Sequence, residues 1–289
     1  MGTETDVKIS DCIDWLRYTV SSSMEQSNML PPIPSIQPTG EIVGRGFYGY
    51  DRAKPLEGGG FMMWHTEKPE MKICIELPGQ ALAELRRDGF EVEDILEYNH
   101  NQRLPELTYN RIDAAVDIKN AGVEVFDLWK EIEKKRVKMK ARKARFLRSW
   151  EGELNADTVE VGSREGSPRF LRVYNKAAQM GMSGVSWARI ELELKKKRGN
   201  VFARSVMLHG RTESLRRELS EVMQTKLKWY NAAIAGDRAP HMDVPRPDSK
   251  PNKFVLETII PFIVNHHGEL TNDTKIKLMI AVNDYINLI

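Results

Sequence analysis

Carboxylates recur at alternating positions in two segments of the sequence. Residues 110–118 read NRIDAAVDI, and residues 187–195 read WARIELELK. Side chains alternate between the two faces of a β-strand, so each segment predicts a strand with one apolar face and one charged face. Aspartate is depleted in strands, which makes two on one strand face unusual. The four carboxylates are those of Asp113, Asp117, Glu191 and Glu193.

A third predicted strand, RFLRVYNK at residues 169–176, carries a tyrosine between two basic residues. Tyr174 lies two positions from Arg172 and two from Lys176, which is about 7 Å at a strand rise of ~3.4 Å per residue. Nearby positive charge lowers the pKa of a phenol from its usual value of about 10. We therefore interpret Tyr174 as a candidate nucleophile, with Arg172 and Lys176 as its catalytic neighbours.

If the three strands pair, one face of the sheet gathers the carboxylates, the basic groups and the tyrosine. Clustered oxygen ligands suit hard cations such as Mg²⁺ or Mn²⁺. Such a cation would neutralise a phosphate in the transition state of phosphoryl transfer. A tyrosinate that attacks phosphorus would form a covalent link to DNA and retain the energy needed for rejoining. The residues alone leave a simpler alternative open, in which each strand is half-exposed to solvent.

A long basic helix is expected between the segments at residues 110–118 and 169–176. We predict one helix from Gly122 to Trp150, with its apolar residues on one stripe. Residues 130–148 contain ten Lys or Arg and two Glu, a local charge of +8, whereas the whole chain has a net charge of +2. Such a surface suits salt-dependent contact with DNA phosphates, although a solvated face is the alternative. The DNA-binding candidates are Lys138, Arg142 and Arg145 here, and Lys195 and Lys196 after the last strand.

The remaining segments predict an α+β fold with an antiparallel sheet and packed helices. Residues 1–235 are expected to form this domain, residues 236–252 with four prolines a linker, and residues 253–289 a helical C-terminal segment of unknown role. A hairpin is predicted around SREGSP, between residues 157–162 and 169–176. The other expected elements are a short helix or strand at 10–20, strands at 46–51, 61–65 and 72–77, and helices at 80–87 and 201–235, the last broken at Gly210.

Composition narrows the classes of protein to consider. The two cysteines, Cys12 and Cys74, are far apart, so we expect neither a disulfide framework nor a cysteine metal site, and a cytoplasmic location. Residues 1–8 lack the apolar core of a signal peptide. The apolar stretch at 254–264 is too short to span a bilayer, and we expect no membrane association. Adjacent His266 and His267 diverge by about 100° on a helix and do not form a metal pair.

The three motif segments, in their order along the chain, resemble those of the replication initiation factors of the Rep_trans type. That family includes rolling-circle plasmid initiators, relaxases of integrative conjugative elements and phage replication proteins. Its pattern is a strand R-hydrophobic-D-x-x-x-D, then GSR followed by hydrophobic-R-hydrophobic-Y-[ND]-K, then R-hydrophobic-E-hydrophobic-E-hydrophobic-K. VEVGSREGSPRFLRVYNK at 159–176 contains the middle segment, and Arg164 matches the arginine of its turn. The resemblance covers roughly residues 10–235.

The resemblance implies a reaction and its partners. Tyr174 would form a 5′-phosphotyrosine link at an origin, with the four carboxylates near a divalent cation and Arg164 among the DNA contacts. The implied partners are origin DNA, single-stranded or in a hairpin, a host helicase and a second copy of the chain. Two alternatives stay open: a non-catalytic DNA-binding regulator on the same fold, and a metal-dependent nuclease that uses water. The presence of both Tyr174 and the carboxylates disfavours the regulator.

Overall fold

The computed structural model describes residues 7–22, 29–151 and 154–234. The predicted linker and the predicted C-terminal segment lie outside the described residues, so the division into domains stays a prediction. Within the described part, the chain forms an antiparallel sheet and seven α-helices, which confirms the predicted α+β class. None of the helices described is both long and apolar enough to cross a membrane.

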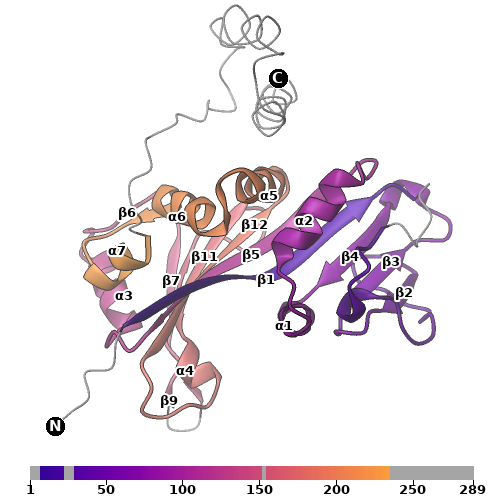
Figure 1. The fold of residues 1–289 in the computed structure, drawn as a ribbon. Coiled ribbons are helices and arrows are strands. Elements are labelled where there is room, and N and C mark those ends of the chain that lie inside the picture. Colours follow the sequence, from indigo (N-terminus) through magenta and orange to yellow (C-terminus); the bar gives the residue numbers. More distant parts are fainter. Residues whose placement is uncertain (1–6, 23–28, 152–153, 235–289) are drawn as a thin grey trace, which may run out of the picture. The chain divides into compact units, whose positions relative to one another are not determined.

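One large antiparallel sheet runs through the described region (Figure 1). The N-terminal strand lies inside it, paired with a strand of residues 73–77 on one side and of residues 108–119 on the other. The expected short helix or strand at 10–20 is thus a long strand. In spatial order the nine strands are β2 (Arg52–Pro55), β3 (Phe61–Trp64), β4 (Ile73–Leu77), β1 (Lys8–Val20), β5 (Thr108–Lys119), β12 (Trp187–Lys195), β11 (Arg169–Asn175), β10 (Thr158–Val161) and β7 (Ala144–Leu147).

Helices cover one face of this sheet (Figure 1). The break predicted at Gly210 in the 201–235 segment is confirmed, because two helices meet there. Gly210 has a φ of 79°, a conformation that favours glycine. The helix at Val92–Asn101 was not expected from the sequence. The α-helices are α1 (Gly79–Arg87), α2 (Val92–Asn101), α3 (Val125–Glu133), α4 (Lys176–Gln179), α5 (Lys197–His209), α6 (Arg211–Val222) and α7 (Lys228–Ile234).

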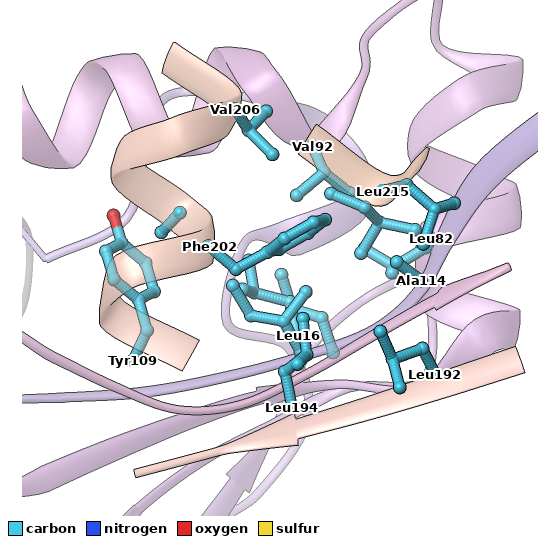
Figure 2. Close-up of a cluster of buried hydrophobic side chains, with 14 of the residues drawn as sticks. Leu16, Leu82, Val92, Tyr109, Ala114, Leu192, Leu194, Phe202, Val206 and Leu215 are labelled. Carbon is cyan, nitrogen blue, oxygen red and sulfur yellow. The ribbon is translucent and has the colours of Figure 1, made fainter. Parts of the chain in front are cut away.

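The core lies between the helices and the apolar face of the central strands. In β5 the even-numbered side chains, such as Ala114, face the helices, and β12 contributes Leu192 and Leu194 at the same level (Figure 2). Phe202 of α5 is fully buried among them. Burying an aromatic or aliphatic side chain of this size contributes about 1.5–3 kcal/mol. Alternation along the same strands therefore leaves the charged side chains on the opposite face.

The predicted long basic helix is wrong. Helix α3 ends at Glu133, and Lys135 has a φ of 54°, outside the helical range. The chain then forms β6 (Lys138–Met139), which pairs with β13 (Met223–Gln224), and the edge strand β7. The physical reason is partly local and partly tertiary. Ala144 and Phe146 alternate with exposed residues as in a strand, and Phe146 stacks on Trp129 of α3 with ring centroids 5.7 Å apart.

The predicted strand at residues 46–51 is also wrong. This segment is a loop, and β2 begins at Arg52. The segment contains Gly46 and Gly49, and Gly49 adopts a φ of 87° that favours glycine. The strands predicted at 61–65 and 72–77, the helix at 80–87 and the hairpin of β10 and β11 are confirmed.

Candidate active site

Three neighbouring strands bring the predicted site residues to one face of the sheet. Strand β12 lies between β5 and β11, so the pairing expected from the three motifs is confirmed. Directly opposite residues in an antiparallel pair share a face. The pairs are Tyr174 opposite Arg189, Arg172 opposite Glu191, Glu193 opposite Asp113, and Arg189 opposite Asp117.

Tyr174 is hydrogen-bonded to a buried carboxylate. Its hydroxyl donates to Oε2 of Glu191 at 3.0 Å, and Glu191 is 5% exposed. The guanidinium of Arg172 binds the other carboxylate oxygen of Glu191. The charged groups of Arg172 and Lys176 each lie 5.9 Å from the centroid of the Tyr174 ring, so both flank it as predicted. Glu191 is therefore placed to accept the phenolic proton.

The pKa of Tyr174 is raised, not lowered as the neighbouring basic residues had suggested. Burial of the phenol is the largest cause, and the negative charge of Glu191 adds to it. Arg189 and Arg172 oppose this increase with a smaller effect. Arg172 is paired with Glu191, so the negative charge of Glu191 offsets much of its effect on the pKa of the phenol. Burial, with Arg189 nearby, also lowers the pKa of Lys176.

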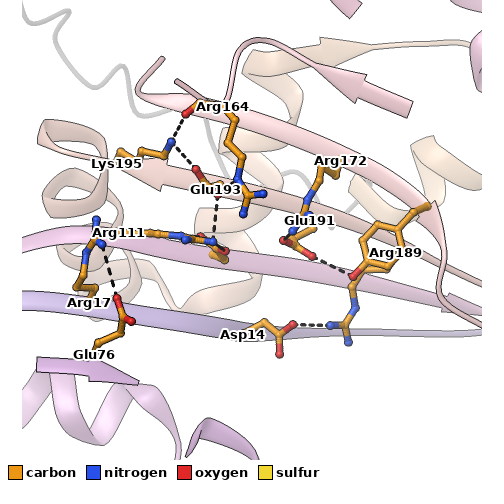
Figure 3. Close-up of polar contacts among 12 residues, drawn as sticks. Asp14, Arg17, Glu76, Arg111, Arg164, Arg172, Arg189, Glu191, Glu193 and Lys195 are labelled. Atoms are coloured by element: carbon orange, nitrogen blue, oxygen red, sulfur yellow. Dashed lines mark hydrogen bonds and ion pairs between the residues drawn. The ribbon is translucent and has the colours of Figure 1, made fainter. Parts of the chain in front are cut away.

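A second cluster of charges lies further along the same face, around Asp113 and Glu193 (Figure 3). Nε of Arg111 donates to Oδ1 of Asp113 at 2.8 Å, and its Nη2 lies 3.1 Å from Oε2 of Glu193. Lys195 forms an ion pair with Oε1 of Glu193, and Nε of Arg164 lies 3.4 Å from Oε2. Each carboxylate in the cluster therefore has at least one cationic partner.

Asp117 has a different environment from the other three predicted carboxylates. Arg189 donates to both of its oxygens, at 2.8 and 2.7 Å, and the indole of Trp187 donates to Oδ1 at 2.7 Å. Arg189 also binds Asp14 of β1 at 2.7 Å. Asp117 thus accepts three hydrogen bonds, whereas Asp113 accepts two, both from Arg111. This fuller engagement suits a role of Asp117 in positioning Arg189 better than metal binding.

The remaining carboxylates are close enough to influence one another. The pKa of Asp113 is raised to about 6, mainly by burial, while Arg111 lowers it and the charges of Glu191 and Glu193 raise it. Oε2 of Glu193 is buried without a hydrogen-bond partner, because its contacts with Arg111 and Arg164 are outside hydrogen-bond geometry. As the side chains stand, no three His, Cys, Asp or Glu residues in the described ranges converge to hold a metal ion.

The six predicted DNA-binding residues do not form one track. Arg145, in β7, lies opposite Glu160 of β10, which lies opposite Arg172, so register puts it on the site face. Lys195 and Arg164 instead reach inward to Glu193. The other three, which are exposed, lie on β6, on the turn before β7 and at the start of α5: Lys138, Arg142 and Lys196.

Sequence reasoning missed two site residues, Arg111 and Asp14. Arg111 stands two positions before Asp113, and this spacing on a strand could have placed both on one face. Asp14 had no such signal, because it lies at an irregularity in the β1–β5 pairing between Ile13 and Trp15. A bulge of this kind redirects a side chain and cannot be seen in an alternating pattern.

Comparison with known proteins supports the replication initiation factors as the class of this protein. A family model for the replication initiation factors, Rep_trans, matches residues 107–242, the stretch that contains β5, β11 and β12. The resemblance inferred from the three motif segments is therefore confirmed.

The fold is similar to a particular solved structure, that of a rolling circle replication initiator protein from Geobacillus stearothermophilus. The two chains are 22% identical with a TM-score of 0.62, and the match covers 76% of this chain and 88% of that one. Similarity at this identity shows a shared fold. A comparison with curated proteins finds no match.

Proposed function

We propose that this protein nicks and rejoins one strand of origin DNA, with Tyr174 as the nucleophile, to start rolling-circle replication or transfer of a mobile element. The observation that carries the proposal is the 3.0 Å hydrogen bond from the Tyr174 hydroxyl to the buried carboxylate of Glu191. The family match supports the role in replication initiation. The fold shared with a rolling circle replication initiator protein supports the rolling-circle mode.

In the proposed reaction, the Tyr174 oxygen attacks the scissile phosphorus. The bond from phosphorus to the 3′-oxygen breaks, that oxygen takes a proton from solvent, and the 5′-phosphate remains on the tyrosine. Glu191 accepts the phenolic proton. Because the pKa of Tyr174 is raised, this proton leaves as the new bond forms rather than beforehand. Attack by a free 3′-hydroxyl on the phosphotyrosine reverses these steps and rejoins the strand.

The phosphate needs positive charge around it. Arg172 and Lys176 flank the tyrosine and can donate to its non-bridging oxygens, where charge increases in the transition state. Mg²⁺ or Mn²⁺ is the cofactor we propose, because carboxylates are the ligands these ions prefer. Asp113, Glu191 and Glu193 would hold it once their side chains converge. Oε2 of Glu193, which accepts no hydrogen bond although Arg111 and Arg164 lie beside it, fits this role. When bound, the cation would neutralise part of the phosphate charge.

The resemblance also supports the biological setting that we propose. The substrate would be origin DNA in single-stranded or hairpin form, in the cytoplasm. A host helicase and a second copy of this chain would be the protein partners.

Replacement of Tyr174 by phenylalanine tests the nucleophile. Tyr174→Phe removes one oxygen while the ring still packs, so we expect the covalent protein–DNA adduct and nicking to disappear while binding of the same oligonucleotide persists. The measurement is a denaturing gel with an end-labelled strand in the presence of Mn²⁺. Tyr109→Phe is the matched control, because it also removes a hydroxyl from a tyrosine ring, one that is buried in β5 rather than in β11.

The same gel separates the proposal from its alternatives. An adduct that persists in Tyr174→Phe would assign the nucleophile to another residue. Cleavage without any adduct in the unaltered protein would favour a nuclease that uses water. Binding with neither cleavage nor adduct, on a strand that carries the natural origin, would favour a non-catalytic regulator.

A further inference from the structure

Large apolar side chains are exposed together in the loop that precedes β2. We define residues 42–50, IVGRGFYGY, as the aromatic loop. Phe47 and Tyr48 at its tip are 53% and 55% exposed, and Ile42 and Val43 at its base are also exposed. Exposed apolar side chains gathered in one short segment point to an interaction site rather than to packing within the domain.

The aromatic loop is held in a defined shape. Gly46 donates a backbone hydrogen bond to Tyr50 at 3.0 Å, and a side chain on Gly46 would collide with Tyr50 at 2.9 Å. Tyr50 is buried in a small core with Met63 and Cys74, which anchors the loop on the sheet. Tyr48 adopts a φ of 58°, which is rare for a bulky residue and is characteristic of strained functional segments. The shape of the loop therefore keeps the rings of Phe47 and Tyr48 exposed to solvent.

The aromatic loop lies over the same sheet face as the candidate active site. The guanidinium of Arg17 stacks on the Tyr48 ring, 4.2 Å from its centroid. Arg17 of β1 lies opposite Arg111 of β5, which binds Asp113, and Figure 3 shows Arg17 beside Arg111. With strands ~4.8 Å apart and ~3.4 Å per residue, the Arg17 position is roughly 25 Å from Tyr174.

Basic side chains accompany the exposed rings. Arg45 is exposed and has no carboxylate partner within the described part of the chain. Arg17 is partly neutralised by Glu76 at 3.6 Å, but its flat face is stacked on Tyr48. Aromatic rings beside arginines form the surface on which unpaired nucleic-acid bases stack, with the arginines near the backbone phosphates.

We infer that the aromatic loop binds single-stranded DNA by stacking unpaired bases on Phe47 and Tyr48. This inference builds on the proposed function, because the loop would hold the strand that runs across the sheet face from Tyr174. Stacking requires only the flat face of a base, so the site would accept any sequence and would position the strand rather than select the origin.

Affinity for an oligonucleotide without an origin tests the aromatic loop independently of cleavage. The probe is a fluorescently labelled oligothymidine of about 20 nucleotides, bound by the full chain with Tyr174→Phe, and anisotropy is the readout. Phe47→Ala and Tyr48→Ala should each weaken binding about fivefold or more, from the loss of one stacked base. Tyr48→Phe should bind normally, since it keeps the ring.

Phe90→Ala is the matched control. Phe90 is also an exposed phenylalanine, but it lies between α1 and α2 in the helix layer, and its removal should not alter binding. Unchanged affinity in both alanine variants, with melting temperatures showing that they are folded, would overturn the inference. So would oligomers that dissociate in these variants while oligonucleotide affinity stays constant, because the loop would then contact a second copy.

Photo-crosslinking gives a second, positional readout. An oligonucleotide that carries 5-iododeoxyuridine should crosslink to Phe47 or Tyr48, as identified by mass spectrometry of the digested protein. Crosslinks confined to other segments would contradict the inference. If the unaltered protein forms no adduct with DNA but these crosslinks and the alanine effects appear, the proposed nicking function fails while the base-stacking site stands.

Discussion

At the scale of single residues, the buried Asp113 carboxylate would make the proposed metal binding depend on pH. Its pKa is raised to about 6, and a carboxylate must lose its proton before it can bind a cation. If Mn²⁺ binds at Asp113 and Glu193, its affinity should be constant well above pH 6 and fall about tenfold for each pH unit below it. Titration calorimetry between pH 5 and pH 8, in buffers of about 0.1 M ionic strength, measures this dependence.

Two variants make this prediction specific. Asp113→Asn should weaken Mn²⁺ binding and abolish the step near pH 6. Glu160→Gln is the control, because Glu160 is a carboxylate on the same sheet face that lies outside the cluster and near Arg145. Affinity that declines only below about pH 4, the range of an unperturbed aspartate, would mean that Asp113 is not a ligand.

Residue types and alternation were sufficient to predict which side chains share the site face. Tyr174, Arg172 and the acidic residues of β12 are where the motifs indicated. The partners of each charge could not be predicted, because they depend on register between strands far apart in sequence. The predicted direction of the Tyr174 pKa shift was wrong because burial of the phenol, the largest cause, is not visible in the sequence. Arg172 was expected to lower this pKa, but it is paired with Glu191, whose charge raises it.

At the scale of elements, the docking of α5 on the central sheet depends on a glycine. A Cβ on Gly199 would lie 2.5 Å from the backbone oxygen of Tyr109 in β5, and a backbone atom cannot move aside. Gly199→Ala should therefore destabilise the fold by about 2 kcal/mol or more. For a domain of this size the melting temperature should fall by roughly 4–8 °C, measured by circular dichroism.

Gly44→Ala is the matched substitution for this test. A Cβ on Gly44 has no atom within 4 Å, so the same methyl group is added without a collision. We expect a melting temperature within about 2 °C of the unaltered protein. Equal effects of the two substitutions would show that α5 does not approach β5 as closely as described.

The edge strand β7 gives a second prediction at this scale. Arg145 is 61% exposed on the site face, with only a distant contact of 3.9 Å to Glu160. If DNA crosses this face, Arg145→Ala should reduce the slope of log affinity against log salt concentration by about 0.7 to 0.9, the value for one phosphate contact. Arg87→Ala, on the exposed surface of α1, should leave the slope unchanged. An unaltered slope in Arg145→Ala would remove β7 from the DNA-binding surface.

Strands were predictable where apolar and polar residues alternated without interruption. β5, β12 and the hairpin of β10 and β11 are of this kind. The 122–150 segment was mistaken because Leu128 and Ile132 have helical spacing and Phe146 happens to extend it. The packing of Phe146 on Trp129 and the pairing of β7 with β10 distinguish a helix followed by a strand from one long helix, and both contacts are tertiary.

At the scale of the whole molecule, the sheet separates stability from chemistry. The helix-covered face holds the apolar core, and the open face carries the candidate site, the aromatic loop and Arg145 of β7. Substitutions such as Gly199→Ala should therefore change stability, whereas those at Tyr174, Phe47 or Arg145 should change reaction or binding with little effect on folding. This division follows from the alternation of β-strands, since each strand contributes to both faces.

The interior position of β1 also bears on how the chain assembles during synthesis. This strand leaves the ribosome before the rest of the sheet. Its neighbours β4 and β5 come from residues 73–77 and 108–119, and β5 acquires β12 only at residues 187–195. At ~5–20 residues per second, roughly 10 to 40 s pass before the central strands are complete. Throughout that interval the apolar side chains of β1, among them Ile13 and Leu16, have no finished core to enter. Until β4 and β5 have been synthesised, β1 is an unpaired strand, the kind of segment that chaperones shield from aggregation.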